Sequence, residues 1–207
     1  MKNNNEVILS TAYFPPISYM KLVISNDVVI EGHENFVKQT YRNRFRVLGP
    51  NGILNLTIPL IKNSGQKTPI QEVLIDNSQN WQALQLRSLE SAYRSSPYFE
   101  YYFPYVEEFF TQPQYQLFKL NQEVLLQLVK LLRASSSLRL SDKYIEEGSS
   151  NFDFRDIIHP KKENWNENWL KYYQVFESKF GFTPDLSILD LIFNLGPDAL
   201  LFLKKCN

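Results

Sequence analysis

The chain has 207 residues, 43% of them hydrophobic, which is enough for one domain with a buried core and excludes a disordered chain. Its 22 basic side chains balance 22 acidic ones, so it lacks the basic excess of a general nucleic-acid-binding protein. The chain has one cysteine, Cys206, which excludes a disulfide within it, and its two histidines are too few for a multi-histidine metal site. No apolar run suits a signal peptide or a membrane span, so we expect a cytoplasmic protein.

Short apolar runs near the N-terminus predict two buried strands, at residues 6–10 and 27–30, joined by a short helix over residues 17–24. Prolines make residues 13–16 a rigid loop between the first strand and this helix. Strand, helix and strand form a β-α-β unit, and ligands gather at the carboxyl ends of parallel strands. We therefore expect a site near residues 11–13 and 31–34.

The next stretch, residues 34–59, combines a polar cluster with a hairpin signal. Apolar and polar residues alternate on both sides of a Pro-Asn-Gly turn, which predicts an antiparallel hairpin. The alternation places Arg44 and Arg46 on one face and Phe45 and Val47 on the other. Arg42 lies two residues before Arg44, so strand alternation places it on the same face as the other two arginines. Three guanidinium groups can then converge on a phosphate or carboxylate.

This reasoning identifies a group of candidate substrate-binding residues. They are Tyr13, Lys38, Tyr41, Arg42, Asn43, Arg44 and Arg46. Lys62 can add positive charge, and His33 is the candidate catalytic base because an imidazole titrates near neutral pH. The alternative is an ordinary solvated strand whose arginines pair with glutamates such as Glu31 or Glu34. His159, beside Pro160 and two lysines, is more typical of an ordinary surface group.

Helices dominate the rest of the chain. Residues 71–75 predict a strand, residues 80–94 and 115–134 predict helices, and residues 98–110 form a dense aromatic band. A long helix followed by an apolar run predicts a further parallel strand at residues 138–144. The remaining expected helices are an amphipathic one over residues 165–180, another over 186–195 and a last turn or two over 199–204.

Four long segments carry a resemblance to a known family. They read TAYFPPISYMKLV, FVKQTYRNRFRVLGPNG, SAYRSSPYFEYY and YYQVFESKFGFTPDLSILDLIFNLGP. In this order, and over nearly the whole chain, they resemble the WbqC-like protein family. Its members are named for their occurrence in gene clusters for bacterial O-antigen (lipopolysaccharide) and related surface glycans. The resemblance implies a role in surface-polysaccharide precursor synthesis and attaches no reaction.

Together these elements predict an α/β fold. Its mixed, mostly parallel sheet would have about five or six strands with a hairpin, flanked by helices. Residues 1–145 would form the α/β core, and residues 146–207 a helical C-terminal part packed on the same domain. The alternative is an α+β fold with an antiparallel sheet.

Two hypotheses about function follow. In the first, the protein is a transferase that binds a nucleotide-activated sugar or another phosphate-bearing ligand. The arginines would hold the diphosphate, Tyr13 and Asn43 would orient the sugar, and the cofactor is unknown. In the second, it is a non-catalytic binding or assembly protein, such as a homo-oligomer, that uses the aromatic band as its interface. The chain has no Walker loop, dinucleotide-binding fingerprint, nucleophile elbow or zinc-protease motif.

Overall fold

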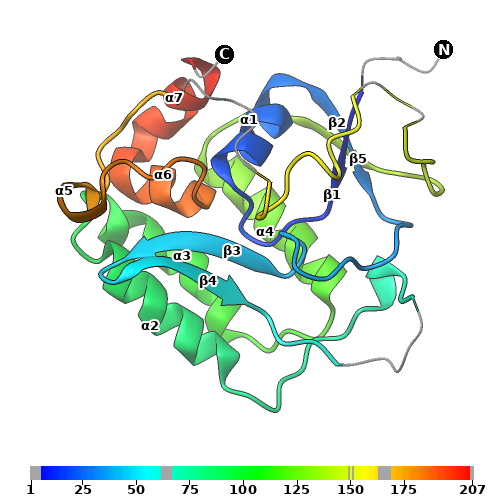
Figure 1. Ribbon diagram of the computed structural model, residues 1–207, viewed down its shortest axis with the longest axis horizontal. Coiled ribbons are helices and arrows are strands. Elements are labelled where there is room, and N and C mark those ends of the chain that lie inside the picture. Colours follow the sequence, from blue (N-terminus) through cyan, green and yellow to red (C-terminus); the bar gives the residue numbers. More distant parts are fainter. Residues whose placement is uncertain (1–5, 62–66, 149, 151, 163–168, 206–207) are drawn as a thin grey trace.

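The computed structural model describes residues 6–61, 67–148, 150, 152–162 and 169–205 (Figure 1). Lys62 and Cys206 lie outside the described residues, as does the first part of the helix expected over residues 165–180. In Figure 1 a parallel sheet lies at the right, a hairpin lies beside the helices at the lower left, and the C-terminal helices lie at the upper left.

A small parallel sheet forms the N-terminal part of the fold. Its strands are β1 (Val7–Ser10), β2 (Asp27–Glu31) and β5 (Ser137–Leu140), in the order β1-β2-β5. The register places Ser10 of β1 beside Glu31 of β2, and helix α1 (Ile17–Ser25) connects these strands. Strands β1 and β2 are continuous apolar runs, as is typical of strands that are covered on both faces of a sheet. The predicted β-α-β unit is confirmed, and so is the later parallel strand over residues 138–140, although residues 141–144 are not part of it.

The predicted hairpin is confirmed as well. Strands β3 (Arg44–Gly49) and β4 (Gly52–Thr57) pair antiparallel and form a separate two-stranded sheet. Gly52 takes a φ of 109°, which only glycine adopts easily, and it closes the turn. Phe45 and Val47 are fully buried while Arg44 and Arg46 lie on the outer face, as the alternation predicts.

The predicted single sheet of five or six strands is wrong, because the described residues hold five strands split between two sheets. The strand expected at residues 71–75 is instead a 3₁₀ helix, η1 (Ile70–Glu72), followed by isolated bridges at Leu74 and Ile75. Pro69 favours a turn at this point. The backbone partners that follow come from two segments, residues 59–61 and 115–117, so no continuous ladder forms.

Three helices cover the hairpin and the centre of the molecule. They are α2 (Trp81–Tyr93), α3 (Phe99–Thr111) and α4 (Leu117–Leu131). Helix α2 packs against both α3 and β3. The Phe14 ring lies 5.1 Å from that of Phe45 and stacks on that of Phe110, so the loop, the hairpin and the aromatic band share one core.

The C-terminal part is less helical than predicted. Its elements are α5 (Glu177–Phe180), α6 (Ile188–Leu195), the 3₁₀ helix η2 (Gly196–Asp198) and α7 (Ala199–Lys205). The helix expected over residues 165–180 is wrong for residues 169–176, where the chain is irregular. The Gln174 side chain bonds both the N–H and the C=O of Thr183, and the Tyr172 hydroxyl donates to Asp190. These tertiary bonds hold the segment despite its amphipathic pattern.

Candidate functional site

The carboxyl ends of β1 and β2 hold a buried ion pair. Arg42 donates from Nε to Glu34 Oε1 (2.8 Å) and from Nη2 to Glu34 Oε2 (2.6 Å). The same Nη2 donates to Ser10 Oγ (2.6 Å), at the end of β1. The two charged side chains are only 5% and 8% exposed. The pairing with glutamate, weighed as the alternative for these arginines, is therefore the one that Arg42 makes, and it is buried rather than solvated.

A second buried carboxylate ends strand β2. Glu31 is fully buried and accepts hydrogen bonds from Ser141 Oγ (2.8 Å) and from the backbone N–H groups of His33 and Ile145. Its Oε2 lies 4.0 Å from Nη1 of Arg155. These bonds tie the segment after β5 to the end of β2.

Arg155 also makes a bidentate pair with Asp153. Its Nη2 lies 2.6 Å from Asp153 Oδ2, and its Nε is 2.9 Å from Oδ1. Burial alone would raise the pKa of Asp153, but the bonds and charge of Arg155 outweigh it and hold that pKa below its usual value. Because Asp153 also bridges to Ile8, the pair fixes residues 152–155 along β1. Figure 1 shows this segment, in yellow, alongside β1.

Between these two ion pairs lies a small cavity, which we call the inner pocket. Its volume is about 10 Å³, room for one water-sized group. Its polar lining residues are Ser10, Thr11, Tyr19, Thr40, Tyr41, Arg42 and Arg155. It lies at the carboxyl end of β1, where the β-α-β unit predicts a ligand.

A larger and more open cavity, which we call the basic hollow, lies on the outer face of the hairpin. Its volume is about 360 Å³, within the range of small-molecule sites. It is lined by Arg46, Ile53, Pro160, Lys161, Lys162, Thr183 and Pro184. Three of these side chains are cationic and none is acidic, so the basic hollow is suited to an anion.

The inner pocket and the basic hollow are neighbours. Arg46, which lines the basic hollow, has its guanidinium carbon 6.0 Å from the ring centre of Tyr41, which lines the inner pocket. Ile158 lines the inner pocket and Pro160, two residues later, lines the basic hollow. Burial raises the pKa of Tyr41 although the Arg46 charge lowers it, so this phenol stays protonated at neutral pH.

The structure does not bring the three predicted arginines together. Arg42 precedes β3 and turns inward to Glu34, whereas Arg46 faces the basic hollow from β3. Arg44 is half-buried on the outer face of the hairpin and lines neither cavity. Of the predicted binding residues, Tyr41 and Arg42 line the inner pocket and Arg46 lines the basic hollow.

The other predicted residues lie apart from both cavities. Tyr13 is fully buried and its hydroxyl donates to Gln85 Oε1. Asn43 is also buried and donates to the Ile58 carbonyl. Lys38 is exposed, and so is His33, whose Nε2 lies 3.1 Å from the Ser141 carbonyl oxygen. The substrate and catalytic roles given to these four residues stay predictions.

Residues that the sequence analysis did not select complete the two cavities. Lys161 and Lys162 are more than a hundred positions from Arg46, and Arg155 is equally far from Arg42. The two lysines are visible in the sequence as part of the basic run His159-Pro160-Lys161-Lys162. His159 Nδ1 accepts the Lys161 backbone N–H (3.0 Å), and burial together with the two lysine charges lowers the pKa of His159.

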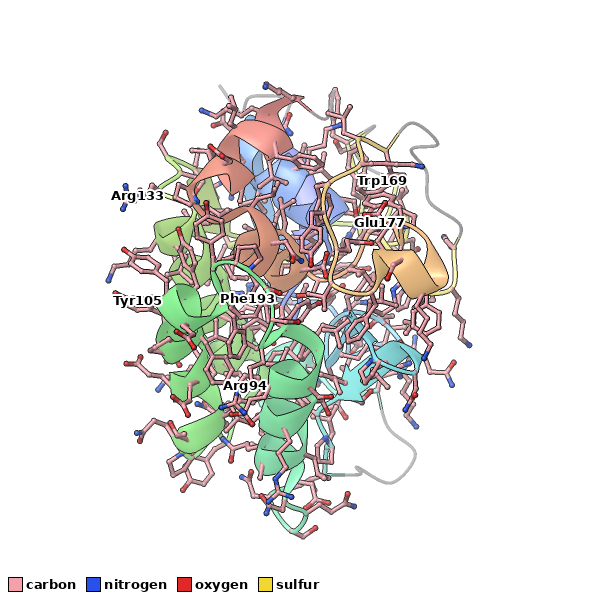
Figure 2. All side chains as sticks on the ribbon, turned by 90° about the vertical axis from the view of Figure 1, so that its left-hand side faces the viewer. Arg94, Tyr105, Arg133, Trp169, Glu177 and Phe193 are labelled. Carbon is pink, nitrogen blue, oxygen red and sulfur yellow. The ribbon has the colours of Figure 1, made fainter. Side chains whose placement is uncertain are left out.

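The aromatic band becomes helix α3. Its inner face is buried in the core through Phe99, Phe103 and Phe110, while Tyr101 and Tyr105 are exposed. Figure 2 shows Tyr105 at the outer side of this helix. The interface hypothesis therefore depends on these two tyrosines.

The described residues hold no group of three or more His, Cys, Asp or Glu side chains placed to bind a metal ion. Among those same residues, no helix is both long and apolar enough to cross a membrane.

Comparison with known proteins gives one family and one distant relative. The model of the WbqC-like protein family matches residues 11–161. "Uncharacterized protein Rv1507c" of Mycobacterium tuberculosis is 25% identical over 225 aligned positions, which cover 96% of this chain and 97% of the relative. No solved structure gives a significant match. The family match includes Arg42, Arg46, Arg155 and Lys161.

Proposed function

The chain belongs to the WbqC-like protein family, and from this membership and the basic hollow we propose that it binds a phosphate-bearing small molecule. Arg46 would receive the phosphate with its planar fork of donors, and Lys161 and Lys162 would add positive charge. The basic hollow is large enough for a phosphate and the group that carries it.

The observation that carries this proposal is the convergence of three cations in one concave wall. Arg46 comes from β3, and the two lysines come from a stretch that begins a few residues after the segment fixed against β1 by the Arg155–Asp153 pair. Like charges held together repel each other. The lining itself contains no carboxylate, and the buried carboxyl of Asp185, next to the lining residue Pro184, interacts with Arg46. A bound anion removes this repulsion, so it should favour the folded protein.

Family membership supports a finer proposal about the ligand class. A nucleotide-activated sugar of surface-polysaccharide synthesis carries a diphosphate, whose charges suit a wall of three cations. A transferase that uses such a donor remains the enzyme class we propose.

Calorimetric titration with inorganic phosphate, pyrophosphate and UDP-glucose tests the proposal. Arg46→Ala should weaken binding at least about tenfold, because a charge-assisted hydrogen bond contributes about 1.5–3 kcal/mol. Lys161→Ala should weaken it less, because a lysine acts as a point charge. Lys204→Ala, an exposed lysine on α7, is the matched control and should bind like the wild type. Binding that is absent, or unchanged by Arg46→Ala, would refute the proposal.

A further inference from the structure

We infer that the ligand of the basic hollow is a phosphate ester with an apolar group close to its phosphate, and that Ile53, Pro160 and Pro184 bind this group. The inference rests on the proposed function, because it concerns the group that the bound phosphate carries. It goes further than that proposal, since it places the phosphate on one side of the basic hollow and an aromatic ring or an alkyl chain on the other.

The lining of the basic hollow is divided between charge and apolar surface. Besides its three cations and Thr183, it is formed by three apolar side chains, Ile53, Pro160 and Pro184, which come from three separate segments of the chain. A single exposed apolar side chain is ordinary, but three that converge in one concave wall form a patch that a ligand can cover. Small-molecule sites typically combine such apolar surface with a few charged groups that orient the ligand.

Ile53 faces outward from the hairpin. It pairs with Leu48 at the end of the ladder, and it is 49% exposed although it is a large apolar residue. The next outward positions on β4, Asn55 and Thr57, are polar and exposed, as is usual for the solvent face of a strand. A ligand group that covers Ile53 removes apolar surface from water, which favours binding.

The register of the hairpin sets the distance between the apolar side and the phosphate side. Arg46 pairs with Asn55, so Ile53, two residues before Asn55, is its diagonal neighbour on the same outer face. Diagonal neighbours of an antiparallel pair lie about 7–8 Å apart. The apolar group must therefore begin within a few bonds of the phosphorus atom, as it does in an aryl or alkyl phosphate.

The apolar wall is formed before any ligand binds. Gln174 bonds both the N–H and the C=O of Thr183, the residue before Pro184. His159 Nδ1 accepts the backbone N–H of the residue after Pro160 (3.0 Å). A proline ring has almost no side-chain freedom to lose, so covering this wall costs little conformational entropy.

Titration calorimetry with methyl phosphate, phenyl phosphate and n-hexyl phosphate tests the inference. The three esters carry the same phosphate group, and the two larger ones add a flat ring or an alkyl chain. At least one larger ester should bind the wild type about tenfold more tightly than methyl phosphate, which requires the burial of roughly 60 Å² of apolar surface. The ester with the larger gain shows whether a ring or a chain is the source of the apolar group.

Two matched variants show where the gain arises. Ile53→Thr keeps the β-branched shape that suits a strand, and it should reduce the gain to less than about threefold while changing the affinity for methyl phosphate by less than about twofold. Ile61→Thr is the control, because Ile61 is 51% exposed and does not line the basic hollow. This variant should keep the full gain.

The outcomes separate the inference from the proposed function. If methyl phosphate binds but neither larger ester gains affinity, or the gain survives Ile53→Thr, the inference is wrong and the proposed function stands. If Ile61→Thr removes the gain equally, or Ile53→Thr weakens all three esters equally, the inference is also wrong. If no ester binds the wild type, the inference is wrong, and the titrations with pyrophosphate and UDP-glucose then decide the proposed function on their own.

Discussion

Asp190 of helix α6 offers the sharpest test of the energetics of this fold. The residue is 1% exposed, and its Oδ2 accepts hydrogen bonds from the Tyr172 hydroxyl and from Gln174 Nε2. Burial raises the pKa of Asp190 from 3.8 to about 6, although these bonds oppose the rise. The folded protein therefore holds this proton at a pH where the unfolded chain has released it.

The sign of the effect follows from this difference. The stability that the protonated carboxyl provides is complete below pH 4 and is lost as the pH rises through about 6. A rise in pKa from 3.8 to about 6 corresponds to about 3 kcal/mol, at about 1.4 kcal/mol for each pKa unit. Asp190→Asn removes this charge and keeps an oxygen that accepts from Tyr172 and Gln174. The Tyr93 hydroxyl also faces the carboxylate and can accept from the new amide.

We expect Asp190→Asn to raise the free energy of unfolding at pH 7.5 by up to about 3 kcal/mol, and to change it little at pH 4. Urea unfolding followed by circular dichroism at pH 4, 5, 6 and 7.5 measures this difference. Asp27→Asn, at the exposed start of β2, is the control and should show no such pH dependence. A loss of stability that is equal at every pH would show that the carboxylate is needed as an acceptor and would refute the reasoning.

Two further substitutions test the buried contacts. Glu34→Gln leaves the Arg42 charge unpaired in the interior, so it should lower the free energy of unfolding in urea by about 3 kcal/mol. Glu6→Gln breaks a half-exposed ion pair and should lower it by less than about 1 kcal/mol. Equal losses in the two variants would contradict this. Gly196→Ala should lower the free energy of unfolding by about 2 kcal/mol or more, since Gly196 has a φ of 53° and a Cβ there would lie 2.5 Å from the Tyr98 ring. A variant that melts at the same temperature as the wild type would contradict this.

Elements set by local patterns could be predicted from the sequence. The apolar run at residues 27–30 and the turn around Gly52 act over a few neighbours, so β2 and the hairpin follow from composition and spacing. Residues 169–174 and 71–75 could not be predicted in this way. The conformation of residues 169–174 depends on distant groups such as Asp190 and Thr183, and that of residues 71–75 on backbone partners at 59–61 and 115–117, which local periodicity does not reveal.

The candidate site shows the same division. Strand alternation predicts that Arg42 and Arg46 face one shared anion, but the strand begins only at Arg44, so the alternation does not extend to Arg42. Arg42 turns to Glu34, eight residues earlier. The lysines that join Arg46 come more than a hundred residues later, shortly after the segment that the pair between Arg155 and Asp153 holds along β1. No spacing rule connects residues this far apart along the chain.

The balanced composition of the chain also gives no indication of the basic hollow. Equal numbers of acidic and basic side chains give no net charge, yet charges are not distributed evenly in the fold. Three carboxylates, from Glu31, Glu34 and Asp153, are used inside the molecule to hold the strand ends and the segment beside β1. Cations with no such partner in the cavity lining then face one hollow from two elements. A neutral net charge therefore argues against broad binding to nucleic acid, and it leaves open a local site for one small anion.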